Sequence, residues 1–350
     1  TIIEAKKDER PSLIVCKTQI GYGLPTKAGT EKAHGEPPGE EELLKAKENL
    51  GWPTDKKFYI PDDVLAHFRE VKTKGEEFEQ AWLERFRAYK EVYPELGAEF
   101  ERRMAGELPK DWKNGLRTFT ADPIGTATRN SSGIVLNEIA ERLPELMGGS
   151  ADLAPSTKTW INSSRAFQAN SREGRNIHFG VREHSMGGVV NGMAYHGGVL
   201  PFGSTFLVFS DYMRPAVRIS ALSHLHSIWI YTHDSIGVGE DGPTHQPVEH
   251  LMALRAIPNL TVIRPCDANE AREAWIVAIE KKDSPIALIL SRQNIPTIDR
   301  TKYAGAEGLQ KGAYVLADLG EGKPELILMA SGSEVDLIIK AGERLAAEGI

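Results

Sequence analysis

The chain has 350 residues, a formal net charge of −7 at pH 7, and 41% hydrophobic against 26% charged residues. This balance is typical of a soluble globular protein, and the length allows two domains, or one whole domain with parts of others. The negative charge argues against nucleic-acid binding, and no apolar run approaches the roughly 20 residues of a membrane span. We therefore expect neither a nucleic acid nor a membrane as a partner.

The two cysteines and the two chain ends carry further expectations. Cys16 and Cys266 stand in strand-like surroundings without a CxxC partner, so we expect reduced core thiols in a cytoplasmic protein. The chain opens without Met and stops inside an amphipathic helical pattern, KAGERLAAEGI. We expect a segment of a longer polypeptide.

The first hundred residues show few regular elements. The β-branched run SLIVCKT (residues 12–18) predicts a buried strand, and the Gly- and Pro-rich stretch after it predicts a long loop. A helix is expected over residues 40–50, followed by an irregular crossing over 52–63. Aromatic residues at helical spacing between residues 64 and 104 predict linking helices packed on a larger body.

After Phe119 the pattern becomes an alternation of helices and strands. Strands are predicted at residues 145–152, 176–180, 199–209, 227–235, 260–265 and 285–292. Helices are predicted at residues 131–143, 182–198 and 215–222, from about 248, and from the Asp267 to Glu270 capping box. This alternation predicts an α/β fold with a doubly wound, mostly parallel sheet and helices on both faces. A further unit is expected to begin over residues 318–332, with LILMASG (residues 326–332).

The stretch GVGEDGPTHQPVEH (residues 237–250) contains the Gly-x-Gly-x-x-Gly spacing of a dinucleotide-binding turn. In such a turn the helix must begin at the glycines, because its free amides hold the pyrophosphate. Pro243 and Pro247 prevent a helix from starting before about residue 247. The spacing is therefore read as a coincidence within a polar loop at the carboxyl end of a buried strand.

Five of the ten histidines fall between Ser223 and Leu251. We read His224, His226 and His250 as solvated surface groups. His233 and His245 are read as functional, because they stand at a strand end and in a proline-braced loop. Metal ligation is the rival role, but no HExxH or CxxC spacing supports it.

Other candidate residues have a structural reading as well as a functional one. Glu183 begins a predicted helix, where an acidic residue ordinarily serves only the helix dipole. The aromatic residues Phe206, Phe209 and Tyr212 surround a strand end, where core packing is the common explanation. Arg129 and Arg292 lie at element edges, where a guanidinium suits a phosphate ester or an ordinary ion pair.

Several segments together resemble transketolases, in that family's order. They are AGTEKAHGEPPGEEE, GGSADLAPSTKT, FGVREHSMGG, TFLVFSDYMRPAVR, THDSIGVGEDGPTHQPVEHL and SRQN. The resemblance implies transfer of a two-carbon ketol group from a ketose phosphate to an aldose phosphate, with thiamine diphosphate as cofactor. It also implies four parts: the end of a diphosphate-binding domain (1–60), a helical connecting segment (61–115), a pyrimidine-binding domain (116–300) and the start of a C-terminal domain (301–350).

The resemblance implies a role for each candidate residue. Glu183 matches the carboxyl group that hydrogen-bonds the pyrimidine ring and promotes its imino form, a task for which an apolar surrounding that raises the pKa would be useful. Phe209 matches the ring that stacks on the pyrimidine, with Phe206, Tyr212 and Asp152 around it. His233 and His245 match histidines that bind the sugar hydroxyls and assist proton transfer, and Asp241 matches the carboxylate at the C2 hydroxyl. The residues that match the phosphate-binding cluster are Arg129, Ser156 and Arg292. His34 matches a histidine that contacts both cofactor and substrate.

One departure from the family concerns the metal. The Gly-Asp-Gly motif with a following Asn, which binds Mg²⁺ or Ca²⁺ and the diphosphate in transketolases, is absent here, so no metal ligand is assigned. The resemblance also implies a homodimer with active sites at the subunit interface. Alternative readings are dihydroxyacetone synthase, 1-deoxyxylulose-5-phosphate synthase, a β-type subunit of 2-oxoacid dehydrogenases, or a non-catalytic assembly partner.

Overall fold

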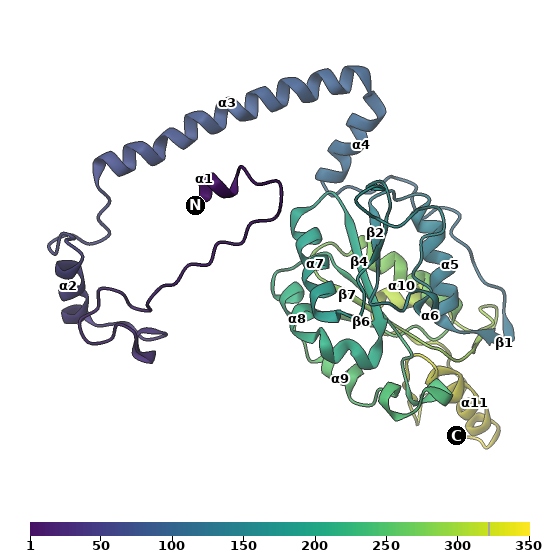
Figure 1. Ribbon diagram of the computed structural model, residues 1–350. Coiled ribbons are helices and arrows are strands. Elements are labelled where there is room, and N and C mark those ends of the chain that lie inside the picture. The colour runs from purple at the N-terminus through teal and green to yellow at the C-terminus, as the bar shows by residue number, and fades with distance from the viewer. Residues whose placement is uncertain (321–322) are drawn as a thin grey trace. The chain divides into compact units, whose positions relative to one another are not determined.

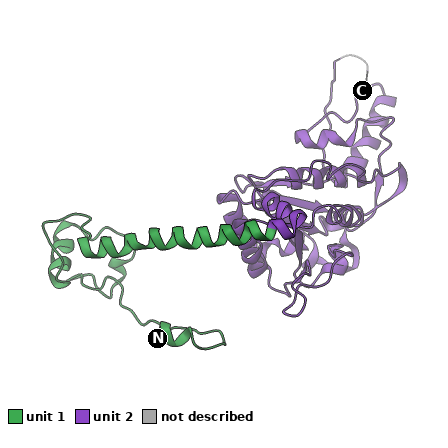
Figure 2. Ribbon diagram, turned by 90° about the horizontal axis from the view of Figure 1, so that it is seen from above, with its two compact units in different colours: residues 1–89 green, residues 90–350 purple. Residues whose placement is uncertain are grey.

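The computed structural model describes residues 1–320 and 323–350. Its chain divides into two compact units, residues 1–89 and 90–350, which Figure 2 distinguishes by colour. In the described part of the chain, no helix is long and apolar enough to cross a membrane.

The first unit is built from three short helices, most of one long helix, and connecting loops. Its elements are α1 (Ile2–Ala5), η1 (Glu31–Ala33), α2 (Glu40–Asn49) and most of α3 (Asp62–Val92). The α2 helix begins with three glutamates, which suit the positive end of the helix dipole. Glu42 also accepts hydrogen bonds from the backbone amides of Thr26 and Lys27, at 2.8 and 3.1 Å, and so attaches the preceding loop to the helix.

The predicted strand over residues 12–18 is wrong, because this segment forms no regular element. Leu13 and Val15 are 89% and 82% exposed, and Cys16 is exposed, so it is not the core thiol expected from the sequence. A β-branched run forms a strand only when a neighbouring strand pairs with its backbone. No strand is present among residues 1–89, all of which the structure describes.

The second unit contains the strands β1 (Asp122–Thr126), β2 (Leu146–Ser150), β3 (Asn176–His178), β4 (Leu200–Phe206), β5 (Ile228–Thr232), β6 (Thr261–Ile263), β7 (Ile286–Leu290) and β8 (Ile295–Thr297). Its α-helices are the end of α3, then α4 (Pro94–Met104), α5 (Thr128–Ala140), α6 (Ala154–Thr157), α7 (Glu183–His196), α8 (Arg214–Leu222), α9 (His250–Arg255), α10 (Ala268–Glu280) and α11 (Glu334–Ala347). Short 3₁₀ turns are η2 (Leu207–Tyr212), η3 (Ile236–Asp241), η4 (Pro243–His245) and η5 (Ala306–Lys311).

Six strands form a parallel sheet in the order β3-β2-β4-β5-β7-β6, which Figure 1 shows at the centre of this unit. Alternate residues of β5 enter two separate cores, as the period of a strand requires. Ile228 and Ile230 pack with side chains of α5 and α10, and Trp229 and Tyr231 pack with those of α7, α8 and α9. The predicted doubly wound α/β fold is confirmed.

Two departures lie outside this sheet. Residues 326–332, expected to open a further unit, have no regular structure up to the turn before α11. An antiparallel pair of β1 with β8 was not predicted, because Pro123, Gly125 and Pro296 make both segments look like loops. Gly125 is required there, since a Cβ atom would lie 1.8 Å from the carbonyl oxygen of Ile295.

Candidate active site

Most candidate residues of the second unit gather at the carboxyl edge of the parallel sheet. The register pairs Ser150 with Ser204, Phe206 with Thr232, and Thr232 with Leu290. The segments that leave β2, β4, β5 and β7 therefore start side by side. Open α/β sheets bind ligands at this edge.

The loop after β5 is not a dinucleotide-binding turn. Its first α-helix begins at His250, beyond all three glycines, as the prolines predicted. The segment between forms two short 3₁₀ turns, η3 and η4, which the sequence did not predict. Gly239 and Gly242 have φ angles of 79°, a conformation that side chains with a Cβ rarely adopt, so these glycines shape the loop.

Five rings form an aromatic group at the ends of β4 and β5. The members are Phe206, Phe209, Tyr212, His233 and His245. Phe206 lies 5.8 Å from Phe209, and Phe209 lies 5.9 Å from Tyr212, both in stacked arrangements, while His245 contacts Phe209 edge-on at 5.3 Å. Tyr212 is 65% exposed, so this group presents an aromatic face to the outside of the chain.

His233 is the most constrained member of the aromatic group. Its ring stacks on Phe206 with 3.6 Å between centroids, and its Nδ1 lies 2.9 Å from the hydroxyl of Thr232. Its backbone has a φ of 59°, which is unfavourable for a residue other than glycine, and only 3% of its surface is exposed. Burial, and then the positive charges of Arg129 and Arg292, lower the pKa of His233 to about 3. The imidazole is therefore neutral at pH 7.

Two arginines and one aspartate lie next to His233. Asp241 Oδ2 is 3.8 Å from His233 Nε2 and 3.5 Å from Arg292 Nε. Arg292 also donates to Glu240 at 2.6 Å, and Arg129 donates to the carbonyl oxygen of Ser156 at 3.0 Å. Burial and the neighbouring Arg292 lower the pKa of Arg129. Two guanidinium groups in one place suit an anion with several oxygens, such as a phosphate.

A hydrogen-bonded clip holds these arginines together. The Thr128 amide donates to Ser291 Oγ at 2.9 Å, and the Ser291 amide donates to Thr128 Oγ1 at 2.7 Å. The clip joins the start of α5 to the end of β7 and thereby places Arg129 beside Arg292. Neither Thr128 nor Ser291 was singled out from the sequence, although each adjoins a predicted site residue.

Glu183 is the first residue of α7 and is 7% exposed. Its carboxyl group has no hydrogen-bond or ion-pair partner among residues 1–320 and 323–350. The α7 helix contacts both β4 and η2, the elements that carry Phe206, Phe209 and Tyr212. The α7 helix also packs on α8, and Gly187 allows this close approach, because a Cβ atom there would lie 2.6 Å from Cβ of Ala216.

Two predicted site residues lie apart from the contacts described above. Asp152 is exposed, has a φ of 64°, and lines a cavity of about 380 Å³ together with Trp160 and His178. His34 belongs to the first unit, where it is exposed and follows η1. Within the described part of the second unit, Asp152 has no contact with the aromatic group.

Three family models match the chain in succession. The transketolase thiamine diphosphate binding domain matches residues 1–109, the transketolase pyrimidine binding domain matches residues 125–297, and a transketolase-like C-terminal domain matches residues 312–350. The chain is 52% identical over 349 residues to the transketolase of Geobacillus stearothermophilus and 50% identical over 346 residues to that of Bacillus subtilis. The chain belongs to the transketolase family.

Solved transketolases share its structure. A transketolase from Leishmania mexicana is 45% identical with a TM-score of 0.90, covering 99% of this chain and 51% of its own. A transketolase from Pichia stipitis in complex with sedoheptulose-7-phosphate is 42% identical with a TM-score of 0.92, covering 100% of this chain and 52% of its own. The match to the Geobacillus and Bacillus proteins covers 99% of this chain and 52% of each of them, so the chain spans about half the length of these relatives.

Two histidines of this transketolase-family chain differ from the sequence-based reading. His250 is 5% exposed and lies 3.1 Å from Asp211, so it is not a solvated surface group. His226 is half-buried and bonds the carbonyl oxygen of Ala278 at 2.7 Å, and burial lowers its pKa. Both partners are distant in sequence, so local pattern gave no signal for either contact. His224 is exposed as expected.

Asp234 also has a role that the sequence did not indicate. It directly follows His233, but its carboxylate pairs with Arg264 at 2.8 Å in a buried ion pair. Arg264 reaches on to Ser331, Ser333 and Glu334 at the start of α11. This network fastens the carboxyl end of β5 to the last helix of the chain.

Proposed function

We propose that this chain provides the pyrimidine-binding part of a transketolase active site. In the whole protein, this site would use thiamine diphosphate with Mg²⁺ or Ca²⁺ to move a two-carbon ketol group from a ketose phosphate to an aldose phosphate. The observation that carries the proposal is the buried, unpartnered carboxyl of Glu183 on a helix that packs against the aromatic group.

The residues present fit the pyrimidine half of thiamine diphosphate. Stacked aromatic rings at Phe209 and Tyr212 can take one face of a heteroaromatic ring. The Glu183 carboxyl can hold a proton toward a ring nitrogen, since a buried carboxyl without a partner gains from a hydrogen bond to the ligand. When bound, the cofactor would supply a nucleophilic thiazolium carbon for the transfer.

The other side chains would bind and orient the substrate. His233 is neutral at pH 7, so it can accept as well as donate a hydrogen bond at a sugar hydroxyl. His245 and Asp241 would contact further hydroxyl groups. Arg129 and Arg292, with Ser156 close to Arg129, would hold the phosphate. Asp152 at the cofactor and His34 at both ligands remain proposals by resemblance alone.

We extend the proposal to the assembly on more general grounds. The Pichia stipitis relative was solved with a sugar phosphate, which supports that substrate class for this family member. We propose that the protein forms a homodimer whose active sites are shared between the subunits. We also propose a cytoplasmic location, which suits two free cysteines. The proposed domain boundaries within the chain are at residues 60, 115 and 300.

The test is the variant Glu183→Gln in the whole protein, assayed with a ketose phosphate donor and an aldose phosphate acceptor. Gln has the size of Glu but cannot carry the proton of a carboxyl group, so we expect kcat to fall by about 10²-fold or more, as for loss of a positioned acid–base group. Near-normal kcat would refute the assigned role.

Glu270→Gln provides a matched control. Glu270 is also 7% exposed and lies in the first turn of a helix, but its carboxylate accepts hydrogen bonds from the Cys266 amide at 2.8 Å and the Tyr314 hydroxyl at 2.6 Å. We expect this variant to lose stability while its kcat stays within about twofold of wild type. Equal losses of kcat in the two variants would indicate a general effect of replacing a buried glutamate.

A further inference from the structure

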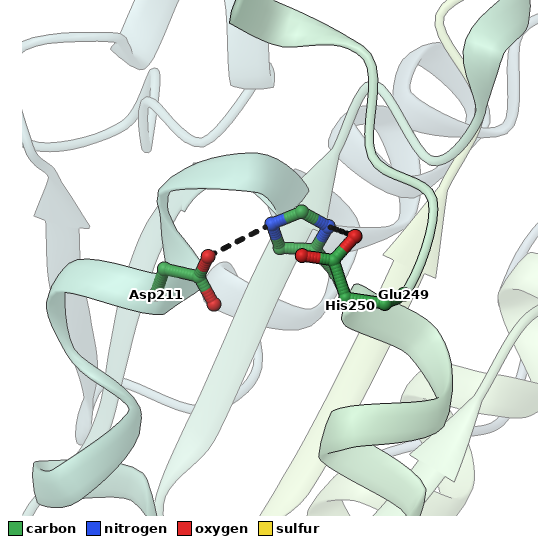
Figure 3. A group of neighbouring side chains, drawn as sticks. All are labelled: Asp211, Glu249 and His250. Atoms are coloured by element: carbon green, nitrogen blue, oxygen red, sulfur yellow. Dashed lines mark hydrogen bonds and ion pairs between the residues drawn. The ribbon is translucent and has the colours of Figure 1, made fainter.

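A histidine and two carboxylates form a cluster that the proposed function does not use. Asp211 lies in η2, Glu249 immediately precedes α9, and His250 is the first residue of α9 (Figure 3). One ligand atom from each side chain lies within 4.8 Å of those of the other two. In the described part of the chain, no second group of three or more such side chains is as close.

The hydrogen bond to Asp211 fixes the tautomer of His250. A carboxylate accepts hydrogen bonds and cannot donate them, so the 3.1 Å contact requires the hydrogen of a neutral imidazole to be on Nε2. Nδ1 then presents a lone pair. Histidines that bind metal ions usually donate a hydrogen bond from one ring nitrogen to a carboxylate and bind the ion with the lone pair of the other nitrogen.

The lone pair of Nδ1 faces a negative charge. His250 is 5% exposed, and its Nδ1 is buried without a hydrogen-bond partner among residues 1–320 and 323–350. The nearest charged atom given for it is Oε2 of Glu249, at 3.8 Å. A lone pair and a carboxylate oxygen repel each other, so this arrangement favours a positive charge at Nδ1, which either a proton on the ring or a metal ion between the two atoms supplies.

We propose that Nδ1 of His250 and the carboxylate of Glu249 bind a divalent transition-metal ion, with Zn²⁺ as the preferred ion and Asp211 as the outer carboxylate that orients the ring. A zinc–nitrogen bond and a zinc–oxygen bond, each roughly 2.0–2.2 Å long, add up to slightly more than the 3.8 Å between Nδ1 of His250 and Oε2 of Glu249. One zinc ion therefore fits between these atoms with a bent N–Zn–O angle. Water would complete the coordination.

The donor set selects the class of ion. Mg²⁺ and Ca²⁺ prefer sites made of oxygen ligands only, whereas imidazole suits zinc, copper and nickel. The Glu249 side chain is 73% exposed and free to adjust toward an ion. A bound ion would hold the His250 ring in the orientation that hydrogen-bonds Asp211 in η2, the turn that carries Phe209 and Tyr212.

The proposal is tested by calorimetric titration of the chelator-treated 350-residue chain with ZnCl₂ at pH 7. Parallel titrations use MgCl₂ and CaCl₂. We expect wild type to bind one more equivalent of zinc than Glu249→Gln or His250→Gln, and neither Mg²⁺ nor Ca²⁺ to compete at equal concentration. Asp211→Asn, which leaves both ligands in place, should weaken this equivalent by about 10- to 100-fold.

His226→Gln is the matched control, because His226 is a half-buried histidine whose ring already bonds a carbonyl oxygen. Its zinc stoichiometry should equal that of wild type. Glu249 is exposed, so Glu249→Gln should fold normally, and circular dichroism checks this. Equal zinc binding by wild type, Glu249→Gln and His250→Gln would overturn the proposal. So would a ¹⁵N spectrum showing His250 doubly protonated at pH 7 in the presence of zinc, since a proton would then occupy the place assigned to the ion.

Discussion

At the scale of single residues, His233 shows strain held in place by its surroundings. A left-handed backbone in a residue other than glycine costs on the order of 1–3 kcal/mol and persists only where neighbours hold it. Here the Phe206 ring, the Thr232 hydroxyl and the burial of the side chain hold it. Such strain is concentrated at functional sites, which agrees with the position of His233 between the aromatic group and the arginines.

The low pKa of His233 predicts a pH-dependent contribution to stability. An unfolded histidine has a pKa near 6.5 and the folded one about 3, so the unfolded state binds the extra proton between these pH values. The contribution of His233 to the free energy of unfolding is fully present above pH 6.5 and is lost as the pH falls toward 3. The free energy of unfolding then changes by at most about 1.4 kcal/mol per pH unit.

The variant His233→Asn removes this titration, and Asn tolerates the left-handed backbone better than most residues. Urea unfolding of both proteins between pH 7.5 and 4.5 is the measurement. We expect the unfolding free energy of wild type to fall more steeply than that of the variant below pH 6.5. Parallel curves would show that His233 is protonated as easily in the folded state as in the unfolded one.

At the scale of elements, the contact of α7 with α8 depends on one glycine of an adjacent pair. A Cβ atom at Gly187 would lie 2.6 Å from Cβ of Ala216 and 3.6 Å from Met213, whereas one at Gly188 would have no neighbour within 4 Å. The two positions have the same backbone environment in one helix. They therefore separate the effect of packing from that of helix propensity.

We expect Gly187→Ala to lower the unfolding free energy by about 1–3 kcal/mol, because the added methyl group forces α7 away from α8. Gly188→Ala should raise it by about 0.5–1 kcal/mol, since alanine favours the helix over glycine. Urea midpoints of the 350-residue chain measure both. Opposite signs are the expected result, and a shared sign would show that the helices do not pack as described.

The elements also show what sequence could and could not predict. The parallel strands were predictable because each is buried on both faces and is therefore a continuous apolar run in the sequence, as at residues 286–290. Such a run is visible without knowing which strand pairs with it. Residues 12–18 also contain a β-branched apolar run, but a strand needs a neighbouring strand as well, which local pattern does not report. The site follows the same rule: His233 and His245 were predicted as site residues from their place at a strand end and in a proline-braced loop, whereas the His250–Asp211 contact, 39 residues apart, was not predicted.

At the scale of the whole second unit, Arg264 joins three segments that are far apart in sequence. It pairs with Asp234 at the end of β5 at 2.8 Å and donates to Ser331 at 2.9 Å and Ser333 at 3.1 Å, and it also pairs with Glu334 at the start of α11. The side chains of Arg264 and Asp234 are 7% and 1% exposed, while that of Glu334 is 49% exposed. The two ion pairs of one arginine therefore lie in different surroundings.

This difference predicts unequal effects of breaking them. Arg264→Met leaves the Asp234 carboxylate buried without a cation, so we expect a loss of about 3–5 kcal/mol and faster amide hydrogen exchange in α11. Glu334→Gln removes only the partly exposed pair and should cost no more than about 1 kcal/mol. The double variant Asp234→Asn with Arg264→Met removes the buried charge as well, and so should recover part of the stability lost by Arg264→Met alone.

Urea unfolding followed by the fluorescence of the buried Trp229 and Trp275 measures the unfolding free energies of the three variants. A double variant no more stable than Arg264→Met would show that Arg264 acts through its contacts with α11, and that the buried charge of Asp234 is not what fastens this helix to the sheet.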